Sequence, residues 1–108
     1  HRALIKDEQL QDPYGAISDY NKAIEINPKY ALSYYNRGIA KIKLGDYSGA
    51  ISDYSKAIEI NPKYTNAYIN RGVEKNKVGD MKGACSDWKQ ASILGDEDAA
   101  KWVKEYCN

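Results

Sequence analysis

Apolar side chains recur with helical spacing along most of this chain. In residues 49–60 they fall at i, i+1, i+4, i+7 and i+8, which is one broad face of an amphipathic helix. These positions are Ala50, Ile51, Tyr54, Ala57 and Ile58. Pro62 ends the helix, because proline disfavours helical backbone at the residue before it, here Asn61.

A second apolar pattern, in residues 32–44, precedes this helix and is followed by Gly45 and Asp46. Glycine can end a helix in the left-handed conformation, and aspartate can cap the helix that follows. The two patterns together predict a unit made of a helix, a tight turn, a second helix and a turn that contains proline.

This unit returns every 34 residues. Residues 15–30 read GAISDYNKAIEINPKY and residues 49–64 read GAISDYSKAIEINPKY, so only Asn21 and Ser55 differ. A looser copy, GACSDWKQASILGDEDA, begins at Gly83. Self-similarity at a fixed period indicates stacked supersecondary units. We therefore expect helices at 14–26, 32–44, 48–60, 66–78, 82–94 and 97–106.

The repeated positions resemble those of the tetratricopeptide repeat (TPR) family. Counted from Ala31, the unit has the family's aromatic, small and proline residues at Tyr34, Gly38, Ala50, Tyr54, Ala57 and Pro62. The next unit matches with Tyr68, Gly72, Ala84, Trp88 and Ala91. The resemblance covers roughly residues 12–94. It implies an all-α, right-handed solenoid of antiparallel helix pairs, with about two and a half repeats and a C-terminal capping helix.

The resemblance also implies one domain over residues 1–108. Its parts would be a partial first repeat (1–30), a second repeat (31–64), a third repeat (65–95) and a capping helix (96–108). The cap is expected to turn an apolar side to the array and a polar side to solvent, as the end of a solenoid requires. Only a remnant of the first helix, residues 1–10, precedes the first copy. This end can fray, pair with a second copy or continue into further repeats.

The balance of charge excludes several classes of partner. The formal net charge is +1, with acidic and basic residues interleaved, so no overall field favours nucleic acid or an anionic membrane. No apolar run approaches the ~20 residues that span a bilayer, and no signal-peptide pattern is present. We therefore expect no nucleic-acid or membrane partner. The compartment is not determined, although a soluble, cytoplasmic chain is favoured.

Catalytic chemistry has little support in the sequence. The one histidine is His1, so a serine or cysteine nucleophile has no credible base, and the cysteines lack zinc spacing. We expect no enzyme activity, metal or cofactor. Cys85 stands where the other copies have Ile17 and Ile51, which favours a buried small hydrophobe. A disulfide with Cys107 is the alternative, if the cap folds back onto that helix.

Charged residues also follow the period. Asp19, Asp53 and Asp87 share one position of successive second helices, and Arg37 and Arg71 share one position of the first helices. This arrangement predicts a ladder of ion pairs between helices, with Asp53 within reach of Arg37 or Arg71. The alternative is a basic stripe that binds an acidic ligand, formed by Arg37, Lys41, Arg71 and Lys75.

In the family, the first helices line a concave groove. Carried over, the groove positions are Tyr35, Asn36, Ile39, Ile42, Lys43, Asn66, Ile69, Asn70, Val73, Asn76 and Lys77. Asn36 and Asn70 recur with the period, and each amide offers a donor and an acceptor to a peptide backbone. The resemblance thus implies a non-catalytic scaffold that binds a peptide segment of a partner protein. The alternative is a self-assembly module that forms homo-oligomers through the incomplete first repeat.

One ligand of the family is not expected here. Chaperone cofactors with these repeats bind acidic C-terminal tails through two asparagines and three lysines or arginines. Asn36 matches one clamp asparagine, but Asn66 and Asn70 stand at positions where the clamp has cations. The first repeat offers His1 and Ile5 in place of lysine and asparagine. The sequence therefore argues against chaperone tails as partners.

Overall fold

The computed structural model describes residues 12–107, and within that range every regular element is an α-helix. The helices are α2 (Pro13–Ile26), α3 (Ala31–Lys43), α4 (Tyr47–Ile60), α5 (Thr65–Lys77), α6 (Met81–Ile93) and α7 (Glu97–Tyr106). Each boundary lies within one residue of its predicted position, so the predicted all-α solenoid is confirmed. The predicted remnant of an earlier helix, residues 1–10, lies outside the described residues.

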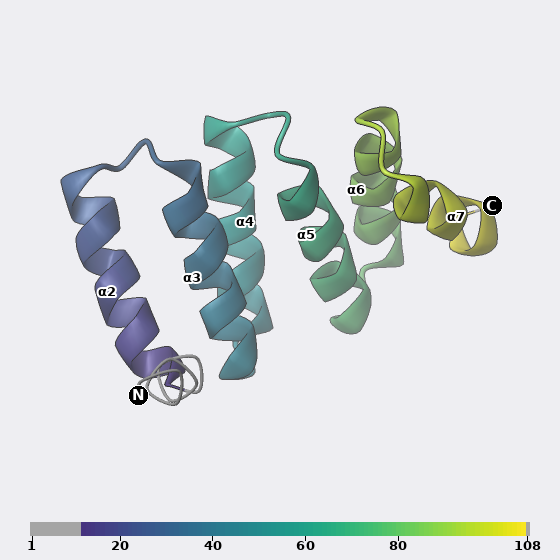
Figure 1. Ribbon diagram of the computed structural model, residues 1–108. Coiled ribbons are helices and arrows are strands. Elements are labelled where there is room, and N and C mark those ends of the chain that lie inside the picture. Colours follow the sequence, from purple (N-terminus) through teal and green to yellow (C-terminus); the bar gives the residue numbers. More distant parts are fainter. Residues whose placement is uncertain (1–11, 108) are drawn as a thin grey trace, which may run out of the picture.

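Helices α2 to α6 follow one another in chain order and run alternately up and down, whereas α7 lies at a large angle to them at the C-terminal end (Figure 1). Each helix packs against the next one along the chain, from α2 to α7. The molecule is elongated, with principal extents of 47 × 27 × 24 Å. This shape is typical of a solenoid, in which each unit contacts only its neighbours.

The turns within the repeats are built from glycine and aspartate, as predicted. Gly45 ends α3 in the left-handed conformation, with φ of 80°. Asp46 then caps α4, since its side chain accepts a hydrogen bond of 2.9 Å from the Gly49 amide. The same two features recur at Gly79 and Asp80, before α6. Because each turn is set locally, the antiparallel pairing of α3 with α4 and of α5 with α6 follows from short sequence signals.

Each helix pair crosses where a glycine faces an aromatic ring. A Cβ atom on Gly38 would lie 2.8 Å from Cε1 of Tyr54, which is fully buried. In the next pair, a Cβ atom on Gly72 would lie 2.5 Å from Nε1 of Trp88 and 3.2 Å from the Ala84 carbonyl oxygen. The rings therefore fill the space that the glycines leave open.

Replacing Gly72 by alanine is expected to lower the free energy of unfolding by about 2 kcal/mol, because the added methyl group overpacks the crossing. The clash outweighs the ~1 kcal/mol by which alanine improves helix propensity. Urea denaturation followed by circular dichroism measures the change. Ser48→Ala, at an exposed position of α4, is the control and should not lower the midpoint. A Gly72→Ala protein as stable as the control would show that the crossing has spare room.

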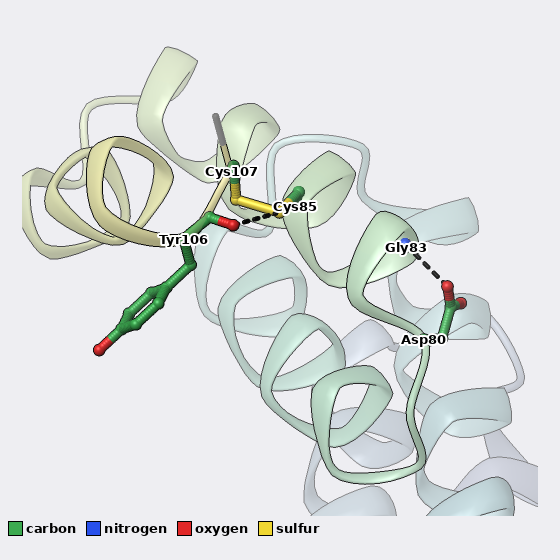
Figure 2. Close-up of a disulfide and its surroundings, with 5 residues drawn as sticks. All are labelled: Asp80, Gly83, Cys85, Tyr106 and Cys107. Atoms are coloured by element: carbon green, nitrogen blue, oxygen red, sulfur yellow. Dashed lines mark hydrogen bonds between the residues drawn. A yellow bond between two sulfur atoms is a disulfide. The ribbon is translucent and has the colours of Figure 1, made fainter.

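The capping helix α7 packs on α6. The rings of Trp88 and Trp102 lie 5.3 Å apart between centroids, and Ala99 is fully buried. At the end of α7 a disulfide joins Cys107 to Cys85, with a Cα–Cα distance of 5.7 Å (Figure 2). The interpretation of Cys85 as an unpaired buried hydrophobe is therefore wrong. The fold of α7 back onto α6 brings the two cysteines together.

The chain segment around the disulfide is partly exposed. Both cysteines are half-buried, and the Tyr106 carbonyl oxygen lies 3.9 Å from Sγ of Cys85. This contact, drawn as a dashed line in Figure 2, is a hydrogen bond only for the reduced thiol, because a disulfide sulfur carries no proton. Tyr106 is 57% exposed, so Ala99, Trp102 and Val103 supply most of the packing of the cap.

Candidate functional site

The predicted ion-pair ladder is present between the first and second helices of the repeats. Arg37 donates through Nε and Nη2 to the two carboxylate oxygens of Asp53, at 2.9 and 2.7 Å. Nζ of Lys41 lies 3.1 Å from the same carboxylate, whose residue is 3% exposed. Arg37 also reaches back to the preceding repeat, where Nη1 donates to Oδ1 of Asn21 at 2.8 Å.

The next rung repeats this geometry. Arg71 donates to both oxygens of Asp87 at 2.8 and 2.6 Å, with Lys75 at 3.4 Å. Its third contact is Oγ of Ser55 at 3.1 Å, the position at which the two copies differ. The hydrogen bonds to Asp87 raise the pKa of Arg71 above its ordinary value. The four cations of the predicted basic stripe are thus engaged with two buried carboxylates, which leaves little basic charge there for an acidic ligand.

The predicted groove residues fall into three groups. The first group borders a cavity of about 710 Å³ between α2 and α3. Asn36, Ile39 and Lys43 contribute from α3, and Ala16 and Tyr20 contribute from α2. These three predicted site residues are therefore brought together beside α2, at the N-terminal end of the described chain.

The second group joins the first helices of successive repeats. Nδ2 of Asn70 donates to the Tyr35 hydroxyl at 2.9 Å. The Tyr35 ring lies 5.0 Å from that of Tyr64 and 5.6 Å from that of Tyr54, between centroids. Burial raises the pKa of Tyr35, so the hydroxyl stays protonated. Tyr35 and Asn70 thus form a fixed polar rung between α3 and α5.

The remaining predicted residues divide between packing and exposure. Ile69 and Val73 pack against the buried cluster around Trp88, and Ile42 is half-buried. The exposed members are Asn66, Asn76 and Lys77. α5 therefore presents two amides and a lysine to solvent.

Glu74 was missed by the sequence reasoning. It is 4% exposed, and its Oε1 has no hydrogen bond among the described residues. Nζ of Lys77 lies 3.7 Å from that oxygen and 5.5 Å from the centroid of the Tyr47 ring. The available signal was a departure from the repeat, since Glu74 stands 34 residues after the buried Ala40. The buried carboxylate of Glu74 thus lies close to the ammonium group of the exposed Lys77.

Residues 12–107 contain no cluster of three or more histidine, cysteine, aspartate or glutamate side chains that could hold a metal ion. Within the same range, no helix combines the length and the apolar character that a membrane-spanning segment requires.

Comparison with known proteins identifies the repeats. One family model, "Tetratricopeptide repeat", matches residues 31–64, and a second, "TPR repeat", matches residues 14–45. A search of curated protein sequences found no match.

Solved TPR domains share the fold over most of the chain. The first TPR domain of Spaghetti (RPAP3), bound to the HSP90 peptide SRMEEVD, is 24% identical with a TM-score of 0.84, over 94% of this chain and 82% of that one. The TPR domain of Arabidopsis OM64 is 29% identical with a TM-score of 0.82, over 97% and 86%.

The second TPR domain of human RPAP3, in complex with the HSP70 peptide SGPTIEEVD, is 26% identical with a TM-score of 0.76, over 85% of this chain and 78% of that one. The repeat period, the glycine–aromatic crossings and these matches agree. Residues 14–64 therefore belong to the tetratricopeptide repeat family.

Proposed function

We propose that the chain is a non-catalytic interaction module that binds a peptide segment of a partner protein along the groove of α3 and α5. The observation that carries this proposal is the row of amide side chains on these two helices, at Asn36, Asn66, Asn70 and Asn76. Similar TPR domains, such as the second domain of human RPAP3, hold a peptide. Their example supports a peptide rather than a small molecule as the ligand.

The amides suit a ligand that is bound through its backbone. Each asparagine offers both a donor and an acceptor, so it can pair with a peptide unit whatever the side chain there. Asn66 and Asn76 are exposed, and Asn36 is half-buried. The rung between Asn70 and Tyr35 holds α5 against α3, which keeps the amides in a defined row.

An acidic C-terminal tail is a poor fit to this groove. Asn66 and Asn70 are neutral where a clamp for such tails has cations, and the carboxylate of Glu74 lies one turn after Asn70 on the same helix. Arg71 is bound to Asp87 and is not available. We therefore propose a segment without clustered acidic groups as the ligand.

Selection from a library of short random peptides tests this function. The selected peptides should bind the Asn66→Ala, Asn76→Ala double variant at least about tenfold more weakly, because two amide contacts of ~1 kcal/mol each are lost. A matched control, Lys82→Ala with Lys104→Ala, removes two exposed side chains of α6 and α7 and should leave binding unchanged. Fluorescence anisotropy measures both affinities, and circular dichroism checks the fold.

The peptide SRMEEVD, which is bound in the first TPR domain of RPAP3, provides the opposing test. It should bind this chain more weakly than the selected peptides do, because the groove lacks the cations that pair with its carboxylates. Equal or tighter binding of SRMEEVD would contradict the exclusion of acidic tails. If the Asn66→Ala, Asn76→Ala variant binds the selected peptides as tightly as the native chain does, the groove is not the binding site.

A further inference from the structure

Helix α2 differs from its counterparts in having no buried residue. The equivalent helices α4 and α6 each bury four residues at the same repeat positions, namely Ala50, Asp53, Tyr54 and Ala57, and Ala84, Asp87, Trp88 and Ala91. In α2 these positions are held by Ala16, Asp19, Tyr20 and Ala23. Asp19 is exposed and the other three are half-buried. The face of α2 thus has nearly the same sequence as the buried face of α4 but is less buried.

The structure shows what covers this surface elsewhere in the array. On α4, Arg37 and Lys41 of α3 bind Asp53, and Gly38 lies against the Tyr54 ring. On α6, the equivalent residues of α5 make the same contacts with Asp87 and Trp88. The two covering helices read RGIAK and RGVEK. The covering helix is therefore defined by an arginine, a glycine and, three residues after the glycine, a lysine.

The open surface is concave and carries an unmatched charge. The cavity of about 710 Å³ has Ala16, Asp19 and Tyr20 of α2 on one side and Ile39 of α3 on the other. No ion pair or hydrogen bond of the Asp19 side chain is found with residues 12–107. A cationic side chain placed there would therefore meet a carboxylate that is still available, as Arg37 does at Asp53.

The preceding sequence of the chain does not carry this pattern. The residues 34 positions before Arg37, Gly38 and Lys41 are Ala3, Leu4 and Asp7. In this register the arginine is replaced by a neutral residue and the lysine by an acid. A leucine would also replace the glycine, whose equivalent has no room for even a Cβ atom beside Tyr54. The groups that cover Asp53 and Asp87 are thus missing from this part of the sequence.

We propose that the face of α2 formed by Ala16, Asp19, Tyr20 and Ala23 is a docking site for an amphipathic helix of a partner protein other than a second copy of this chain. The helix presents the pattern Arg-Gly-x-x-Lys, with glycine at the position that lies against the aromatic ring. Its arginine and lysine pair with Asp19, and its small residue lies against the Tyr20 ring, as α3 lies on α4. This site differs from the proposed peptide groove of α3 and α5, although Asn36 and Ile39 belong to both sets of residues.

A peptide of residues 31–44, which contains the RGIAK sequence, is the probe. Fluorescence anisotropy with the full chain should give saturable binding, and Asp19→Lys should weaken it at least about tenfold, the effect of losing one well-formed charged pair. A peptide with Arg37→Asp and Lys41→Asp should regain affinity for the Asp19→Lys protein. Glu25→Lys makes the same charge change on another exposed side of α2 and should have no effect.

The outcomes separate this site from its alternatives. Asn66→Ala with Asn76→Ala should leave binding of this probe unchanged, since those residues do not border the cavity. Absence of binding, or binding that ignores Asp19→Lys, overturns the proposal. If the native chain is a dimer by light scattering and does not bind the probe, a second copy covers the face. This result also overturns the proposal. If the chain is instead a monomer that does not bind the probe and whose melting temperature falls on Asp19→Lys, the face is assigned to the chain's own N-terminal residues. That result would overturn the proposal as well.

Discussion

Arg71→Met is expected to lower the free energy of unfolding by about 3 kcal/mol, because it leaves a buried carboxylate without its main partner. The side chain of Asp87 is 3% exposed, and Arg71 supplies two of its hydrogen bonds. After the change only Lys75 remains, at 3.4 Å. Methionine keeps the apolar stem of arginine, so most of the loss arises from the charge. Urea denaturation followed by circular dichroism gives the free energy by linear extrapolation.

Two further variants test this explanation. Asp87→Asn in the Arg71→Met background should recover part of the stability, because a neutral amide is cheaper to bury than an unpaired carboxylate. Lys56→Ala breaks the exposed pair between Lys56 and Glu59 and should cause no measurable change. An Arg71→Met protein as stable as Lys56→Ala would mean that water reaches Asp87 and that the ladder contributes nothing to stability.

The ladder also shows why this fold could be predicted so closely from sequence. In a repeat array, a contact between two helices recurs wherever both partners recur, so the period itself carries tertiary information. Arg37 and Asp53 return as Arg71 and Asp87, and both rungs have the same bidentate geometry. The helix boundaries follow because capping and turn signals such as Gly45 and Asp46 are local.

Features that occur once in the chain were harder to predict. Cys107 belongs to the cap, which lies outside the period, so no second copy indicated where α7 would turn. Glu74 interrupts the repeat at a position where alanine is buried, and a single substitution does not reveal what surrounds it. The role of Asn70 depends on a hydrogen bond to Tyr35 in the neighbouring repeat, which needs the distance between α3 and α5. These contacts depend on the placement of helices rather than on their pattern.

The face of α2 is the reverse case, since the repeat pattern predicts full burial there, whereas Ala16, Tyr20 and Ala23 are half-buried and Asp19 is exposed. Ala16 and Tyr20 have the same residue types as Ala50 and Tyr54, which are fully buried. The sequence pattern that covers α4 is missing one period earlier, because Ala3, Leu4 and Asp7 stand 34 residues before Arg37, Gly38 and Lys41. A sequence position is therefore buried only if its partner is supplied, by this chain or by another.

Cys107→Ser is expected to lower the free energy of unfolding of the oxidised protein by about 3 kcal/mol, the value for closing a loop of this length. The disulfide links residues 22 apart and holds the end of α7 against α6. Without it, the cap is held by the contacts of Trp102, Val103 and Ala99 with the Trp88 cluster. Urea denaturation with and without reductant measures the effect. The native protein should lose stability in reductant, and the Cys107→Ser protein should not.

Cys85→Ile separates the covalent link from packing. Isoleucine occupies this position in both other copies, at Ile17 and Ile51, so the substitution restores an apolar side chain without the bond. If loop closure stabilises the cap, Cys85→Ile should be about as unstable as Cys107→Ser. If Cys85→Ile matches the oxidised native protein, apolar contact at this position is sufficient, and the disulfide adds nothing to the stability of the cap. An unchanged midpoint of the native protein in reductant would lead to the same conclusion.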